Sequence, residues 1–142
     1  MIVSGLAHSF KLDVIERMAQ DVFRMALYLA DASLNNLIPL YTTVGEVQAP
    51  GYTAGGIVLT GYKAVMDGPM AMISWADPVW SKSSITARGA LIYNYSRGNR
   101  AVAVVDLGPS PSGDPRGYTS SNGDFVVTLP ELTTKTALIR IL

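Results

Sequence analysis

The stretch YTAGGIVLTGYKAV, residues Tyr52–Val65, combines three glycines with five β-branched residues in fourteen positions. Such glycines could hold a phosphate group, or they could turn the chain between strands. A phosphate-binding loop leads into a helix and closes with Lys followed by Ser or Thr. Here Gly55 and Gly56 are followed by IVLTG, which favours a strand and breaks again at Gly61. The stretch therefore predicts strands joined at glycine turns, where a Cβ atom would clash.

The same pattern of short β-branched runs and turn residues continues through the rest of the chain. From residue 31 onward, short apolar runs alternate with turn signals, and no helical pattern separates them. The predicted strands are IVLTGYKAVM, MAMISWA, SITARGALIYN, RAVAVVDLG, DFVVTLP and TALIRIL. Turns are predicted at Asp67–Pro69, at Asp77–Pro78 and at YSRGN, where Gly98 can adopt positive φ. Residues 109–123 have no apolar period and predict a long loop. The pattern favours an all-β sandwich or jelly roll.

The first 30 residues differ from this pattern. Residues 1–9 are small and weakly apolar and are interpreted as an arm. KLDVIERMAQ follows, with Leu12, Ile15, Met18 and Ala19 at helical spacing. DVFRMALYLA, which covers most of residues 20–30, fits either a strand or a continuation of the helix, and periodicity alone does not decide between them.

Composition limits the classes of function. The 142 residues suffice for one domain, and the chain has no cysteine for disulfides or thiolate metal sites. Eleven basic residues balance eleven acidic ones, which favours neither a nucleic-acid partner nor a membrane surface. No apolar run reaches the roughly 18 residues of a membrane span. Charged residues make up 15% of the chain, against about 25% in ordinary soluble domains. This scarcity suggests either a small well-packed domain or a surface covered by other protein chains.

Two strands are apolar at successive positions. In GALIYN and AVAVVDLG the apolar residues do not alternate with polar ones, so both faces of the sheet are expected to be covered. The small residues Ala90, Ala101 and Ala103 could also face water without penalty. The strand TALIRIL could add to the edge of a sheet, in its own chain or in a neighbour.

No catalytic, cofactor-binding or metal-binding residue is predicted, and we expect no enzyme activity. His8 is the one histidine, and no serine elbow accompanies it. Asp77, Asp106 and Asp124 lie at or near strand ends, where aspartate commonly starts turns. Asp114 is the one carboxylate in SPSGDPRG, too few for calcium.

Two tryptophans flank ADPV. Trp75 and Trp80 are expected in the core or in an interface, and the alternative is a sugar-binding surface that also uses Tyr118. An ion pair between Arg88 and Asp77 could hold the chain together at this segment.

The sequence from about Phe10 to Leu142 resembles a family of tailed-phage virion structural proteins. The shared motifs occur in order and with similar spacing. They are SFK at Ser9–Lys11, ALYxxxASL at Ala26–Leu34, YTTxxEVxxxGYTAGGxxLTG at Tyr41–Gly61, DPxWxxxxITARGALIYN at Asp77–Asn94, RAVAVxDxG at Arg100–Gly108, SxGDFxxxxP at Ser121–Pro130 and xAxIRI at Thr136–Ile141. The insert PSPSGDPRGYTS departs from the family pattern, in which this loop is shorter.

The resemblance implies a fold and a role. It implies a jelly-roll-like β-sandwich over residues 10–142, with an arm at 1–9, a short helix, a long loop at 109–123, and a strand at FRMALYLA. Its members are similar to capsid cement or decoration proteins, which bind the outside of the shell and bridge capsomers. The expected partners are the major capsid protein and neighbouring copies, as a dimer or trimer, without nucleic acid or membrane. The expected location is the capsid exterior, after assembly in the host cytoplasm. The alternatives are a neck or tail component, or a carbohydrate-binding jelly roll that contacts the host.

Overall fold

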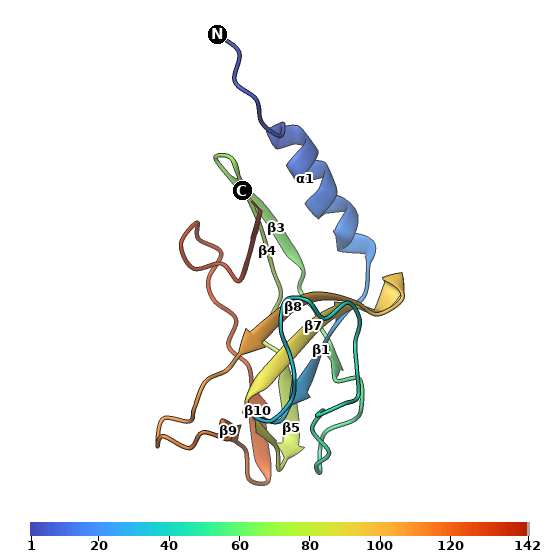
Figure 1. Ribbon diagram of the computed structural model, residues 1–142, viewed down its shortest axis with the longest axis vertical. Coiled ribbons are helices and arrows are strands. Elements are labelled where there is room, and N and C mark those ends of the chain that lie inside the picture. Colours follow the sequence, from blue (N-terminus) through green and yellow to red (C-terminus); the bar gives the residue numbers. More distant parts are fainter. Residues whose placement is uncertain (142) are drawn as a thin grey trace. The chain divides into compact units, whose positions relative to one another are not determined.

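The computed structural model describes residues 1–141 and is mostly β, with 35% of the chain in strands and 11% in helices (Figure 1). One short α-helix near the amino terminus precedes several small antiparallel sheets. These observations confirm the predicted all-β class and the N-terminal helix. The sheets have four, three, two and two strands, and in the described residues they do not display a jelly roll.

The chain divides into two compact units, each built from segments that are distant in the sequence. Unit 1 contains Met1–Asp21, Thr60–Ala76 and the segment from Thr128 onward. Unit 2 contains Val22–Leu59 and Asp77–Val127. Each unit has its own sheets and is described separately.

Unit 1 is a helix on a three-stranded sheet. The sheet is antiparallel, with the order β11-β4-β3. Its elements are α1 (His8–Arg17), the 3-10 turn η1 (Met18–Gln20), β3 (Lys63–Asp67), β4 (Met70–Ser74) and β11 (Ile139–Ile141). The predicted turn at Asp67–Pro69 is confirmed, because Asp67 pairs with Met70 across a two-residue loop in which Gly68 has a φ of +55°.

The helix α1 packs on β3 and β4. It buries Lys11 and Ile15. The Lys11 Nζ donates a 2.9 Å hydrogen bond to the Pro69 carbonyl, and the Tyr62 hydroxyl donates to the Ile15 carbonyl. Because α1 begins at His8, the last two residues of the predicted arm lie in the helix. Among the described residues, no helix has the length and apolar character that crossing a bilayer requires.

Unit 2 is centred on a four-stranded antiparallel sheet with the order β2-β1-β7-β8. Two further pairs of strands, β10 with β5 and β9 with β6, complete it. The elements are β1 (Phe23–Tyr28), β2 (Ile57–Val58), β5 (Val79–Ser83), β6 (Thr86–Ala87), β7 (Gly89–Asn94), η2 (Tyr95–Arg97), β8 (Arg100–Asp106), β9 (Tyr118–Thr119) and β10 (Gly123–Val126). The ambiguity over residues 20–30 is therefore decided in favour of a strand.

The central strands β1 and β7 are buried on both faces within the chain itself. On one face Ala26, Tyr28, Leu91 and Tyr93 form a cluster that is covered by side chains of the long segment 32–41, which crosses the sheet in Figure 1. The prediction that both faces of GALIYN are covered is confirmed. Since the covering comes from the same chain, this strand requires no second protein to shield it.

The glycines of the opening stretch have the predicted structural role. Gly55 and Gly56 have φ values of +95° and +79°. A Cβ atom on Gly56 would lie 1.8 Å from the carbonyl oxygen of Met25, so the loop passes directly against β1. Gly61, with a φ of +67°, separates β2 from β3, where the sequence predicted an interrupted strand.

Several strand predictions need correction. The strand β5 was not predicted, because its sequence VWSKS follows a turn signal and has little apolar alternation. SITARGALIYN forms two strands, β6 and β7, that are divided at Arg88. Of TALIRIL, only Ile139–Ile141 is a strand within the described residues, and Leu142 lies outside them. The loop 109–123 contains β9, which pairs with β6.

Candidate functional site

The titratable residues that the sequence offered for chemistry do not form a catalytic group in the structure. His8 is the first residue of α1 and is exposed. Asp77 precedes β5, Asp124 lies in β10, and Asp106 ends β8 beside Arg88. Among residues 1–141 no three His, Cys, Asp or Glu side chains are placed to hold a metal ion.

Arg88 forms a corner with the end of β8. Its Nε donates a 2.7 Å hydrogen bond to Oδ1 of Asp106, and its Nη1 donates a 2.9 Å bond to the Pro115 carbonyl. The carboxylate beside Arg88 is thus Asp106, and the predicted pair with Asp77 is wrong. The hydrogen bond from Arg88 lowers the pKa of the Asp106 carboxyl, so this ion pair persists under mildly acidic conditions.

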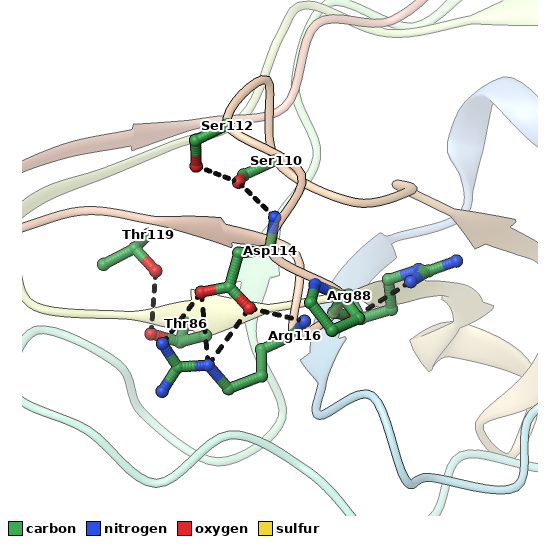
Figure 2. A network of polar contacts seen from close by, with 8 residues as sticks. Thr86, Arg88, Ser110, Ser112, Asp114, Arg116 and Thr119 are labelled. Carbon is green, nitrogen blue, oxygen red and sulfur yellow. Dashed lines mark hydrogen bonds and ion pairs between the residues drawn. The ribbon is translucent and has the colours of Figure 1, made fainter.

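A second ion pair shapes the long loop 109–123. Figure 2 shows the guanidinium of Arg116 forked onto the carboxylate of Asp114, with an Nη2–Oδ2 distance of 2.8 Å. Thr86 on β6 lies next to Thr119 on β9, and their hydroxyl oxygens are 3.0 Å apart. Arg88 and Arg116 thus each bind a carboxylate in this structure.

Beside this corner the surface of unit 2 is hollowed. One hollow of about 460 Å³ is lined by Leu29, Leu34, Val104, Arg88 and neighbouring residues. A second, of about 400 Å³, shares Leu29 and extends to Arg116. Both are open and are lined by apolar side chains together with charged ones, including Asp106 in the first and Asp31 in the second.

A buried carboxylate holds the segment 41–56 onto the sheet of unit 2. Oε1 of Glu46 accepts a 2.7 Å hydrogen bond from the Tyr41 hydroxyl. Oε2 accepts a 2.5 Å bond from the Tyr52 hydroxyl and a 2.9 Å bond from the Gly55 N–H. The Tyr93 hydroxyl donates to the Gly55 carbonyl at 2.5 Å. Every donor has an acceptor, so this cluster is structural.

This cluster was not predicted from the sequence. The sequence feature that could have indicated the cluster is a pair of tyrosines, Tyr41 and Tyr52, which flank Glu46 in a segment otherwise rich in turn residues. An isolated glutamate between turn residues gives no indication that it is buried, although its partners lie only five to nine residues away.

Burial raises the pKa values of the tyrosines in the cluster. The pKa of Tyr52 is raised by burial and then by its hydrogen bond to Glu46, and the pKa values of Tyr28 and Tyr41 are raised by burial and the nearby Glu46 charge. In unit 1, burial raises the pKa of Tyr62 to about 12. The unfolded chain therefore loses these protons at lower pH than the folded protein does.

We expect unfolding at alkaline pH as a result. The tyrosines contribute stability that is intact below pH 10.0, their usual pKa, and is lost as the pH rises above it, because only the unfolded state then releases protons. The measurement is the free energy of unfolding in urea across this pH range. Tyr52→Phe should reduce the slope of stability against pH above that value, whatever its effect at neutral pH. An unchanged slope would contradict the assignment.

Each unit exposes its own apolar side chains. In unit 1 the arm surface consists of Met1, Ile2, Val3, Leu6, Phe10 and Val14, of which the first four are at least 60% exposed. In unit 2 the loop surface consists of Leu29, Leu37, Leu40 and Val44, with Leu37 84% exposed. Surfaces of this kind in a chain with so few charges are typical of protein contacts.

The tryptophans lie in the interior. Trp75 and Trp80 are 6% and 5% exposed. Trp80 packs edge-on against Phe125, and Trp75 against Tyr62. Of the three residues proposed to stack on a sugar, only Tyr118 on β9 is exposed. The prediction of a core position for both tryptophans is confirmed, and neither offers a ring face to a carbohydrate.

Comparison with known proteins found no matching family model, no similar curated protein and no similar solved structure.

Proposed function

We propose that this protein is a structural component of a tailed-phage virion, which binds the outer surface of the capsid and bridges neighbouring capsomers. The proposal includes a jelly-roll-like relation among the sheets. It also includes the major capsid protein and further copies of this chain as partners. Its starting point is the ordered series of motifs that the chain shares with virion structural proteins.

The observation that carries the proposal is that both units expose apolar side chains. A bridging protein needs at least two contact surfaces, because holding two shell subunits at once multiplies the strength of individually weak contacts. The arm surface and the loop surface supply one such contact each.

The stoichiometry in purified virions tests the location. A cement protein should be present in many copies, in a fixed ratio to the major capsid protein. Quantitative mass spectrometry of intact particles measures this ratio. If each particle contains only enough copies for a single neck or tail ring, the protein is a neck or tail component and the capsid role is wrong.

Removal of Met1–Leu6 is expected to weaken binding to shells by at least tenfold while leaving the fold intact. These residues include four exposed apolar side chains, and fully burying each one against a partner contributes roughly 1.5–3 kcal/mol. Shells that lack the protein would be mixed with the variant, sedimented, and assayed for bound protein. Ser4→Ala, in the same arm, is the matched control and should bind normally. Undiminished binding of the shortened chain would contradict an anchoring arm.

A further inference from the structure

Among residues 1–141, the outer strand of the sheet in unit 1 has one edge without a strand partner. The order of that sheet is β11-β4-β3, so β3 pairs with β4 on one side only. A strand edge of this kind presents backbone N–H and C=O groups that can pair with another extended chain.

The hairpin fixes which residues face outward. The two-residue loop places Asp67 opposite Met70, and such a loop closes on a hydrogen-bonded pair. Because alternate residues of an antiparallel strand direct their backbone groups to the same neighbour, Lys63, Val65 and Asp67 bond to β4. The backbone groups of Ala64 and Met66 therefore point to the open edge.

The side chains of β3 are symmetric in a way that suits pairing with an identical strand. Lys63, Val65 and Asp67 share one face and are exposed, while Ala64 and Met66 on the other face are half-buried. Lys63 and Asp67 lie two residues to either side of Val65 and carry opposite charges. A second copy of the strand that runs in the opposite direction, with Val65 opposite Val65, therefore places a positive charge opposite a negative one at both ends.

We propose that β3 pairs antiparallel with β3 of a second copy of this chain, about a two-fold axis through Val65. Ala64 of each copy then exchanges backbone hydrogen bonds with Met66 of the other. The two Val65 side chains meet on the axis, and each Lys63 faces the Asp67 of the other copy. The interface is isologous, and the two three-stranded sheets become one sheet of six strands.

The charges favour a second copy over an unrelated strand. A lone lysine on an edge strand normally prevents such pairing. Here the unfavourable effect of the Lys63 charge on pairing is relieved only by a strand that carries a carboxylate opposite it. A second β3 strand supplies that carboxylate with Asp67. The pairing is independent of the proposed capsid role, and it can be tested in solution with the purified protein.

A single cysteine tests the two-fold axis directly. In this register the two residues at position 65 form a non-hydrogen-bonded pair, with Cα atoms about 4.5 Å apart, which a disulfide can span. The chain has no cysteine of its own, so Val65→Cys introduces the one thiol present. With oxidised glutathione as the electron acceptor, Val65→Cys should form a disulfide-linked dimer nearly completely. Val79→Cys, at a valine of similar exposure on β5, is the matched control and should remain mostly without a disulfide link.

A charge exchange tests the register. Lys63→Asp places like charges opposite each other at both ends and should weaken dimerisation by roughly tenfold or more, measured as the dissociation constant in sedimentation velocity. Lys63→Asp combined with Asp67→Lys restores opposite charges and should recover the dimer. Lys135→Asp changes the net charge equally at an exposed site outside β3 and should leave the dimer unchanged.

The outcomes separate clearly. A mass of twice 15.2 kDa, together with the cross-link at position 65 and the rescue by charge exchange, supports the pairing. A monomer at every concentration, or equal cross-linking at positions 65 and 79, overturns it. A dimer that Lys63→Asp does not weaken uses another surface and also overturns it. A parent protein that dimerises but does not bind shells would count against the capsid role alone.

Discussion

Gly56→Ala should abolish folding of unit 2. The new Cβ atom would lie 1.8 Å from the Met25 carbonyl oxygen and 2.5 Å from its carbonyl carbon, where no flexible side chain can move aside. Met25 lies in β1, the strand paired on both sides by β2 and β7, so relief would require separating the loop from the sheet. The positive φ of Gly56 adds a further penalty for alanine. We expect a loss above about 4 kcal/mol, a large part of the total stability of an ordinary domain.

Gly98→Ala is the control for this substitution. Gly98 also has a positive φ, +65°, but no atom lies within 4 Å of the added Cβ position. Only the backbone penalty of roughly 1–2 kcal/mol applies, so the variant should fold. Urea unfolding followed by circular dichroism compares the two. Similar losses for both variants would show that the contact with Met25 is not what requires glycine at position 56.

Glu46→Ala should have the second largest effect. It removes the acceptor of the Tyr41 hydroxyl, the Tyr52 hydroxyl and the Gly55 N–H at once. Each buried donor left without a partner costs about 1–3 kcal/mol, so a total loss of about 3 kcal/mol or more is expected. Hydrogen exchange should show faster opening of the segment 41–56, which these bonds hold in place. Glu131→Ala, at an exposed glutamate, should stay within about 0.5 kcal/mol of the parent protein.

Glu46→Gln distinguishes the hydrogen bonds from the space that the side chain fills. Its amide oxygen can accept from Tyr52 and Gly55 in place of Oε2, while its NH₂ group donates to the Tyr41 oxygen. The Tyr52 and Gly55 donors keep an acceptor, while the Tyr41 O–H loses its acceptor and the strength given by the negative charge is lost. We expect a loss well below that of the alanine variant. Equal losses for the two substitutions would show that the charge itself, rather than the count of acceptors, stabilises the segment.

The local features of the fold could be predicted from the sequence because they depend on neighbouring residues. Glycine in a β-branched run indicated the turns at Gly56 and Gly61, and the pair Asp67–Gly68 indicated the β3–β4 hairpin. The helix α1 followed from apolar spacing at Leu12, Ile15 and Met18. Periodicity could not separate strand from helix in FRMALY, because its apolar residues fit both an alternating strand and a continued helix.

The long-range arrangement could not be predicted from the residues alone. Nothing near Arg88 indicates that its partner is Asp106 rather than Asp77, since that choice depends on how β7 pairs with β8. The partners of Glu46 are within nine residues of it, but its burial depends on how the segment 41–56 packs on the sheet of unit 2. The strand β5 was missed because only Trp80 and Ser83 in VWSKS face the interior. Two buried positions are too few to show a periodic pattern.

The interleaving of the two units has a consequence for synthesis on the ribosome. The strand β4 is complete once residue 74 has been made, but β11, which pairs with its second edge, comes about 65 residues later, after all of unit 2. A nascent chain that has passed unit 2 therefore still carries an open edge on β4. We expect translational pauses in the region 128–138 to expose newly made chains to aggregation and to increase their need for chaperones.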